Sequence, residues 1–248
     1  MGTMKQIIFA LITTLFLTTA QSQVIQSRRL DVDPAEVAKF EAAVAKKNQM
    51  YNSKDDQARW ITFQIMTGPY AYNYIRTQVA ESMSEFDVVD KTGNDFWQKT
   101  VGPLHTSVGN RIWVVNIEMT YNPTVAEQVN HRRIIYYNVK DDKLNDFWRY
   151  RERAKKIWEE MEMENRVGVM TCLSGCDGNW VQVRFHHKDF TNEEEAWENM
   201  PAFAEAYNGL FGEGSYTEDL ERLRNSLMPN GRRIRHHKRL PELSSSWR

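Results

Sequence analysis

The sequence predicts an α+β protein in which one βαββαβ unit of about 107 residues occurs twice. Two observations support this prediction, a recurrence of residues at a fixed offset and a repeated order of strands and helices. A shift of 107 positions places Phe40 on Phe147 and Gly68 on Gly175. Because such identities are few, the prediction depends mainly on the repeated order of elements.

The first unit begins with an extended run that ends at Val32 and leads into a helix. Asp33 can cap this helix, Pro34 suits its first turn because no hydrogen bond is lost there, and Glu36 completes a capping box. Residues with apolar surface then recur at helical spacing, one of them a lysine with an apolar stem: Val37, Phe40, Val44, Lys47 and Tyr51.

A hairpin, a second helix and a last strand complete the first unit. The first hairpin strand has two faces, Trp60, Thr62 and Gln64 on one, and Ile61, Phe63 and Ile65 on the other. Ser82 and Glu85 indicate the cap of the second helix, which we expect to be interrupted at Thr92–Gly93. The last strand is expected from Arg111 to Tyr121.

The second unit repeats this order with one addition. We expect a strand at 131–139, a helix at 144–161, a hairpin of 166–175 with 179–187, a helix broken at 200–201, an additional helix at 216–227 and a last strand at 232–240. Thr191 and Glu194 indicate the cap of the broken helix. The last strand is strongly basic, so its charges either neutralise acidic helices such as Glu159–Glu164 or Glu193–Glu195 or protect an exposed sheet edge. An anionic ligand, a membrane surface or a polyanion is the functional alternative.

Each unit corresponds to a ferredoxin-like fold, a four-stranded antiparallel sheet with its helices on one face. The other face of each sheet needs a partner, so we expect the two sheets to pack face to face as a pseudo-dimeric barrel. The predicted organisation is a first repeat at 23–124, a second repeat at 125–243 and a frayed C-terminal tail at 244–248.

Residues 1–22 are typical of a secretory signal peptide. Lys5 precedes an uncharged apolar run, and Ala20 and Ser22 are small residues at plausible cleavage positions. The run is too short for a comfortable membrane span, although an uncleaved anchor is the alternative. We therefore expect an exported protein, periplasmic or secreted, without a transmembrane segment after cleavage.

Charge and motifs exclude several classes of function. The chain has 32 basic and 33 acidic residues, a formal charge of -1, so it lacks the basic excess that nucleic-acid binding needs. The motifs of nucleotide-binding proteins and of α/β-hydrolases are missing, and so are metal-ligand spacings such as HExxH. Neither nucleic acid, nucleotide nor metal is predicted as a partner.

The two cysteines, Cys172 and Cys176, lie where an apolar run ends in a turn. In an exported protein they can form a disulfide, which would close a very short loop with a small entropic gain. Two free thiols are the alternative. Their spacing differs from that of a CxxC redox motif.

The repeated order of elements, from Val24 to Leu240, resembles the dimeric α+β barrel superfamily in a form in which one chain supplies both halves. The resemblance depends on topology and repeat, because no diagnostic motif is present. That superfamily includes haem-degrading monooxygenases, cofactor-independent monooxygenases of antibiotic biosynthesis, haem peroxidases and small isomerases. The resemblance therefore implies a fold but no single chemistry.

Five residues are candidates for ligand binding. Asn116 and Glu118 share a face of the expected strand 111–121 with apolar residues, where they would be a polar pair in an apolar pocket or, alternatively, lie in water; Trp113 belongs to the same strand. His186 ends a strand and could ligate haem or act as a base, or be a hydrogen-bonded core residue or a strand-end surface residue. His105 lies in a loop, where site residues and exposed residues both occur.

The leading hypothesis is an exported protein that binds a small hydrophobic molecule, with oxygenase- or isomerase-like chemistry if it is an enzyme. One alternative is a non-catalytic envelope module that associates with itself or another protein, which predicts a core without a useful cavity. The other is haem binding through His186 or His187. No motif assigns a cofactor, and the sequence is compatible with a homo-oligomer.

Overall fold

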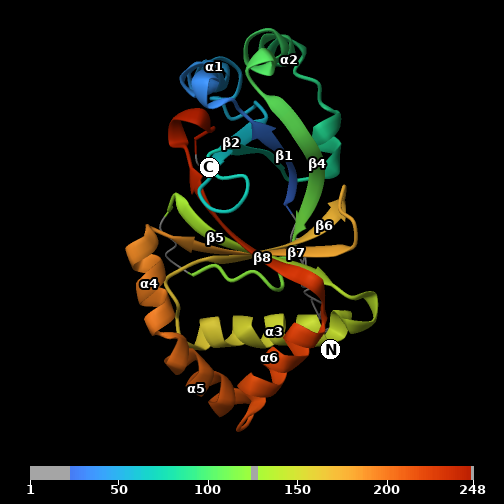
Figure 1. Cartoon of the computed structure of the whole chain (residues 1–248), viewed down its shortest axis with the longest axis vertical. Helices are drawn as coiled ribbons and strands as arrows, with labels where there is room; N and C mark the ends of the chain where they lie inside the picture. Colours follow the sequence, from blue (N-terminus) through green and yellow to red (C-terminus); the bar gives the residue numbers. More distant parts are fainter. Residues whose placement is uncertain (1–22, 124–127, 247–248) are drawn as a thin grey trace, which may run out of the picture.

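Eight antiparallel strands form one closed barrel, and helices lie at its two opposite ends in Figure 1. The computed structural model describes residues 23–123 and 128–246. The expected signal peptide at 1–22 lies outside the described residues, so it stays a prediction. No helix in the described ranges is both long and apolar enough to cross a membrane.

The strands are arranged in two arcs that follow the same pattern. They are β1 (Val24–Asp31), β2 (Arg59–Ile65), β3 (Tyr74–Ala80), β4 (Thr106–Val115), β5 (His131–Val139), β6 (Val167–Ser174), β7 (Asn179–His187) and β8 (Leu227–Arg239). The ring runs β1-β3-β2-β8-β5-β7-β6-β4, so one arc is β4-β1-β3-β2 and the other is β8-β5-β7-β6. The arcs face each other as expected, but they also join edge to edge through the β2–β8 and β4–β6 pairs.

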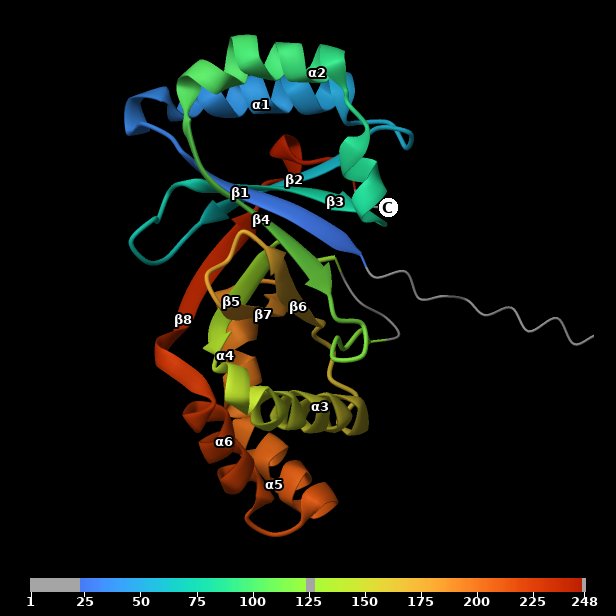
Figure 2. The ribbon, with the colours of Figure 1, turned by 90° about the vertical axis from the view of Figure 1, so that its right-hand side faces the viewer.

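The first arc is covered on its outer face by α1 (Val37–Tyr51) and α2 (Lys91–Phe96), as Figure 2 shows. The predicted start of α1 is confirmed, because the Asp33 side chain accepts a hydrogen bond from the backbone N–H of Ala35 in the short 3-10 turn Pro34–Glu36.

The predicted cap at Ser82 and Glu85 is confirmed, because the Glu85 side chain accepts from the Ser82 N–H before the 3-10 turn Met83–Asp87. The interruption, however, falls at 88–90 and not at Gly93. Gly93 lies in the first turn of α2, where its N–H donates to Asp90 and a Cβ would collide with that carboxylate.

The second arc is covered by α3 (Leu144–Glu160), α4 (Phe190–Glu198), α5 (Met200–Phe211) and α6 (Ser215–Asn225), seen below the barrel in Figure 1. The predicted break before Pro201 is confirmed, since α4 ends at Glu198 and α5 begins at Met200. The predicted cap at Thr191 is wrong, because the Asp189 side chain accepts from the N–H of Asn192 and caps α4.

Three apolar clusters fill the molecule, one under each helical layer and one inside the barrel. Alternation along the strands separates them: on β5, Ile135 and Tyr137 face the helices, whereas Tyr136 packs with the cluster inside the barrel. The layer under α1 and α2 is built around Phe40 and Tyr74. The helix-facing side of the second arc is the larger apolar surface, and it forms one wall of the principal cavity.

The remaining barrel interior is basic and buried. Arg132 and Arg184 are buried; the Arg132 guanidinium lies 3.3 Å from the Phe63 ring centre, and the Arg184 Nε–H donates to Gln182. His237 lies beside Arg132, with Nδ1 3.5 Å from its Nη2. Burial, and then the neighbouring arginines, hold the pKa of His237 well below its usual range, so this imidazole is neutral.

The basic last strand, β8, is an inner strand and not an exposed edge. It pairs with β2 on one side and β5 on the other, which corrects the expectation that its charges protect a free edge. One of its residues does meet an acidic helix, because His236 contacts Glu193 of α4 at 3.0 Å. The other expectation, that the strand neutralises acidic helices, stays a prediction.

The C-terminal tail is not frayed over its first two residues. Ser244 and Ser245 are buried, and their hydroxyls accept hydrogen bonds from the backbone N–H groups of Thr62 and Trp60 on β2. The Ser245 N–H in turn donates to the Trp60 carbonyl. The strand β2 pairs with β8 only over residues 63–65. The C-terminal tail therefore provides hydrogen-bond partners for the backbone groups of Trp60 and Thr62.

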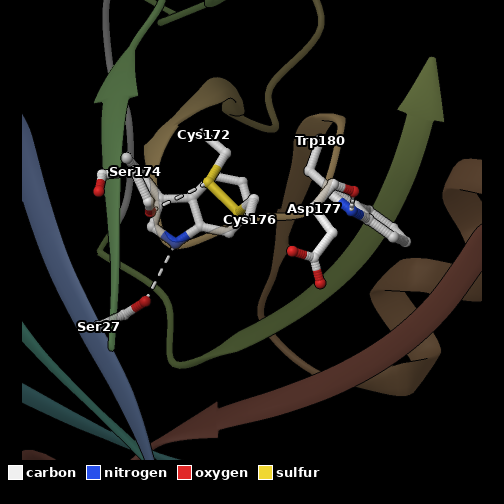
Figure 3. Close-up of a disulfide and its surroundings, with 7 residues drawn as sticks. Ser27, Cys172, Ser174, Cys176, Asp177 and Trp180 are labelled. Carbon is white, nitrogen blue, oxygen red and sulfur yellow. Dashed lines mark hydrogen bonds between the residues drawn. A yellow bond between two sulfur atoms is a disulfide. The ribbon is translucent and has the colours of Figure 1, made fainter. Parts of the chain in front are cut away.

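A disulfide joins Cys172 to Cys176 across the β6–β7 turn, as Figure 3 shows. Both cysteines pack against the cluster inside the barrel that contains Trp113. The Trp113 Nε1–H donates a 3.0 Å hydrogen bond to the Ser27 hydroxyl. Of the two alternatives for the cysteines, the structure has the disulfide.

Candidate functional site

The principal cavity lies between the outer face of the second arc and helices α3 to α6, and its volume is about 1080 Å³. Aromatic side chains form part of its walls, namely Tyr137, Tyr150, Trp158, Phe185, Phe203 and Tyr216. Charged residues of both signs also line it: Arg133, Arg151, Arg224, Arg232, Glu162, Glu164 and Glu195. Trp197 and Met200, at the α4–α5 junction, also line it and are 52% and 42% exposed. The cavity therefore reaches solvent at that junction and could admit a largely apolar ligand.

The wall residues point into the cavity because of two regular periodicities. On β5 and β7, alternate residues such as Tyr137 and Phe185 face the helices. On α3, Tyr150, Ala154 and Trp158 lie on one face at spacings of four residues. The strands and the helix thus present their apolar faces to one another, and the helices α5 and α6 complete the enclosure.

One charged residue, Arg151, occupies a position within this apolar face. It is 4% exposed, and its guanidinium carbon lies 4.6 Å from the Tyr150 ring centre and 5.2 Å from that of Tyr137. Its Nε–H has no hydrogen-bond partner, and no carboxylate within the described ranges pairs with it. By contrast, Arg149 and Arg153 on the same helix both bind Asp219.

Burial of a guanidinium without an acidic partner costs free energy, which neutral acceptors, aromatic rings or a ligand can offset. The faces of aromatic rings compensate part of that cost, because they carry negative potential. The remaining cost of burying the guanidinium can be offset by an anionic or strongly polar acceptor group of a bound molecule. Arg151 is therefore the residue of the cavity wall that favours a ligand-binding site over an empty space between packed elements.

His187 is the histidine that lines the cavity. Its Nδ1 lies 3.5 Å from the Asn165 amide nitrogen. Burial is the main cause that lowers the pKa of His187 to about 4, while the Glu193 carboxylate opposes the shift. The imidazole is consequently neutral near pH 7, which leaves it suited to hydrogen bonding or to ligation of a metal centre.

A smaller cavity, of about 140 Å³, lies in the first half beside Arg28, Arg76 and Trp60. The buried Arg76 guanidinium donates to the Asn48 and Thr62 side chains at 2.9 and 2.8 Å. Burial, and then the nearby Arg28, lower the pKa of Arg76 to about 9. Because neutral acceptors already satisfy Arg76, this cavity is a weaker candidate than the principal one.

The five residues singled out from the sequence lie in three separate places. Trp113 and His186 are inside the barrel, where His186 Nε2 lies 3.9 Å from the position that a Cβ on Gly168 would take. His105 lies between the rings of Phe40 and Trp97, with neither ring nitrogen hydrogen-bonded, so it is not a simply exposed loop residue.

Asn116 and Glu118 do not share a strand face, which corrects the expected extent of the last strand of the first half. The strand β4 ends at Val115, and both residues lie in the turn that follows. The Asn116 side-chain oxygen accepts from the N–H of Met119 and stabilises this turn, while Glu118 is exposed. Neither residue lines either of the two cavities.

Sequence reasoning missed Arg151, although the sequence contained a signal for it. Phe147, Arg151, Ala154 and Trp158 fall on one face of an amphipathic helix, so a charged residue interrupts an otherwise apolar stripe. Such an interruption is a better indicator of a site than the polar residues of loops. Whether such a charged residue is free to bind a ligand depends on whether an acidic side chain pairs with it, and only the tertiary structure decides that.

No known protein-family model matches the chain, and no curated protein matches it. Solved structures do match over most of its length, and they show that the chain has the fold of the dimeric α+β barrel superfamily. A candidate monooxygenase from Lactobacillus acidophilus NCFM is 13% identical, with a TM-score of 0.57 over 91% of this chain and 96% of the other.

Two further structures show the same fold. A candidate monooxygenase from Fusobacterium nucleatum is 11% identical, with a TM-score of 0.58 over 89% of this chain and 94% of the other. A mutant chlorite dismutase from Candidatus Nitrospira defluvii is 9% identical, with a TM-score of 0.54 over 89% and 93%. At these identities the comparison establishes the fold and leaves the chemistry to the site.

Proposed function

We propose that this chain binds a largely apolar small molecule that carries an anionic group, in the principal cavity between the second arc and α3 to α6. The observation that carries the proposal is the buried Arg151 guanidinium, which stacks on Tyr150 and Tyr137 and has no carboxylate partner in the described chain. The aromatic walls would bind the apolar body, and Arg151 would pair with the charge.

A matched pair of fluorescent probes tests this division of roles. Anilinonaphthalene sulfonate is apolar and anionic, and N-phenyl-1-naphthylamine is its uncharged relative. We expect Arg151→Met to weaken binding of the sulfonate about tenfold or more, the effect of losing one charge-assisted hydrogen bond, and to leave the neutral probe nearly unchanged. Equal binding of the sulfonate by the wild type and by Arg151→Met would overturn the proposal.

Lys156→Met is the control variant. Lys156 lies on the same helix and also carries one positive charge, but it is exposed and pairs with Glu152. Its replacement changes the net charge by the same amount as Arg151→Met without touching the cavity. Both probes should therefore bind this variant as they bind the wild type.

Oxygenase-like chemistry is the reaction class that we propose for this cavity. Two matching structures are named as candidate monooxygenases and a third as an anthrone oxidase-like protein. An anthrone loses a proton to give an enolate, whose negative oxygen Arg151 could stabilise. Reaction of the enolate with O₂ then gives the quinone and water. Oxygen uptake with anthrone, absent in Arg151→Met, would support this proposal, and no uptake above the uncatalysed rate would reject it.

Haem is the second candidate ligand, because an imidazole lies on the cavity wall. The residues present fit such a group: His187 could ligate iron, and Arg133, Arg151 and Arg232 could pair with the two propionates. Haem would supply oxidative iron chemistry when bound. Addition of haemin should produce a Soret band that His187→Ala abolishes and His105→Ala retains; a band that persists in His187→Ala would exclude this ligand role.

The alternative of a non-catalytic association module predicts a core without a useful cavity. The principal cavity, with a volume of about 1080 Å³, supports the small-molecule proposal over that alternative. Native mass spectrometry of the mature protein tests self-association, because it reports the number of chains together with any retained ligand.

We further propose that the two halves are copies of one ferredoxin-like unit and that the chain is exported. The same relative strand order in both arcs supports the duplication, and the Cys172–Cys176 disulfide is compatible with an oxidising compartment. N-terminal sequencing of protein recovered from the periplasm or the medium tests export. A start near residue 23 is expected, and recovery in the cytosol with residue 1 retained would reject it.

A further inference from the structure

Three residues that are far apart in the sequence meet behind the principal cavity. They are His131, the first residue of β5, Glu193 on α4 and His236 on β8. The Nε2 atom of His131 lies 3.0 Å from one carboxylate oxygen of Glu193, and the Nε2 atom of His236 lies 3.0 Å from the other. One ligand atom from each residue falls within 4.8 Å of the others.

The two histidines are held on neighbouring strands. His236 lies directly opposite Arg133 in the β5–β8 pair, so His131, two residues earlier on β5, shares its face and is its diagonal neighbour. Their rings stack with centroids 5.6 Å apart, and Phe190 packs edge-on against His131 at 4.4 Å. The side chains are therefore fixed by packing before any ligand binds.

A second hydrogen bond orients His236. Its Nδ1 lies 3.2 Å from the Thr67 hydroxyl, which also accepts a hydrogen bond from the backbone N–H of His236. A hydroxyl can donate or accept, so the imidazole can carry its proton on Nδ1 and direct the Nε2 lone pair towards Glu193. An outer hydrogen bond of this kind is what metal-ligating histidines ordinarily have.

The donor set and the spacing both suit a transition-metal ion. Two imidazoles and one carboxylate form the ligand set of many zinc sites that keep one open position. Zinc bonds of 2.0–2.1 Å place neighbouring ligand atoms roughly 3.3 Å apart in a tetrahedron. Here each Nε2 atom lies 3.0 Å from a different Glu193 oxygen, and one ligand atom from each residue lies within 4.8 Å of the others. Burial of His131 and Glu193 excludes competing water from two of the three ligands.

We propose that His131, Glu193 and His236 form a binding site for one divalent transition-metal ion of the zinc type. Arg133 lies 3.6 Å from Glu193 and also lines the principal cavity, so the site lies directly behind the cavity wall. The site binds its ion independently of any molecule in the cavity, and it differs from the haem ligand considered above, which would use His187.

The test is a titration of Co²⁺ and Zn²⁺ into the full chain, prepared without a polyhistidine tag and treated with a chelator. The wild type is expected to bind one Co²⁺ per chain with visible ligand-field bands, and Zn²⁺ should displace it. A wild-type chain with native near-ultraviolet circular dichroism that binds less than one equivalent would overturn the proposal.

Four variants separate ligation from general damage. Glu193→Gln and His236→Gln should lose most of the affinity, and Thr67→Val, which keeps every ligand, should lose about tenfold. His105→Gln should bind as the wild type does, because His105 lies under α1. Undiminished affinity in His236→Gln, or an equal loss in His105→Gln, would reject the site. If a ligand variant fails to fold, the wild-type stoichiometry and Thr67→Val decide.

Discussion

The side-chain hydroxyl of Thr62, on β2, donates a 2.8 Å hydrogen bond to the backbone carbonyl oxygen of Leu243, which lies 181 residues further along the chain. The same C-terminal segment inserts the Leu243 side chain into the core of the first half, where it is 1% exposed and belongs to the cluster of Phe40 and Val44. A segment near the end of the described chain thus completes an apolar layer that also contains Leu30 and Val32.

Leu243→Ala should lower the free energy of unfolding by about 3 kcal/mol, because it removes buried methyl groups and leaves a cavity beside Phe40. Chemical denaturation followed by tryptophan fluorescence measures the change. Leu210→Ala is the control, since Leu210 is 51% exposed and should change stability by no more than about 0.5 kcal/mol. Equal effects of the two substitutions would mean that the C-terminal segment is not docked in solution.

Asp219→Asn should destabilise the second half. The buried Asp219 carboxylate accepts hydrogen bonds from the Tyr207 hydroxyl at 2.7 Å, from Arg149 at 2.8 Å and from Arg153 at 2.7 Å. Loss of its charge should cost about 2 kcal/mol of unfolding free energy, as expected for hydrogen bonds to an ionised group. Glu218→Gln, at an exposed neighbouring ion pair, should cost less than about 0.5 kcal/mol.

The effect of Asp219→Asn should also depend on pH. Burial by itself raises the pKa of Asp219, but the hydrogen bonds from Tyr207, Arg149 and Arg153 outweigh it and lower the pKa below its usual value. The folded state therefore binds fewer protons than the unfolded state near that pKa, so the stabilisation is present above about pH 4 and is lost as the pH falls further. A difference between the wild type and Asp219→Asn that is unchanged at pH 3 would contradict this assignment.

The order of strands and helices could be predicted because it depends on local patterns. The alternation of Ile61, Phe63 and Ile65 and the Asp33–Pro34 start of α1 are properties of short segments, and both are confirmed. What failed depends on distant partners. Whether Ser244 frays or docks is decided by β2, and the end of β4 at Val115 is decided by where β6 and β1 stop pairing with it.

The candidate site was less predictable for the same reason. Asn116 and Glu118 were chosen because they alternate with other residues of an expected strand, but that strand ends at Val115, before both of them. Arg151 was hidden because its interest depends on two tertiary properties, its place in the cavity wall and the lack of a carboxylate paired with it among the described residues. Glu193 and His236 are 43 residues apart in the sequence, and their meeting depends on the packing of α4 on β8. Spacing motifs detect only ligands that come from one local segment.

Lys47 should make stability rise with pH. Burial, and then the charge of Arg76, lower the pKa of Lys47 to about 8, although Asp90 opposes the shift. Between about pH 8 and the unfolded pKa near 10.4, the unfolded state holds a proton that the folded state has lost, so raising the pH favours folding. Urea titrations of the wild type and Lys47→Met at pH 7.5 and 9.5 measure this. The wild type should gain stability relative to the variant, and a constant difference would contradict the lowered pKa.

The disulfide should stabilise the barrel only modestly, although its cysteines pack beside Trp113 and Trp180. Because the Cys172–Cys176 loop is very short, loop closure predicts a loss of about 2 kcal/mol in the double variant Cys172→Ser/Cys176→Ser. Guanidinium titrations with and without dithiothreitol test this: reduction should move the wild type to the stability of the double variant and leave that variant unaffected. A wild type whose mass confirms reduction but whose midpoint does not move would show that the turn is held by its hydrogen bonds and packing, and that the bridge contributes no measurable stability.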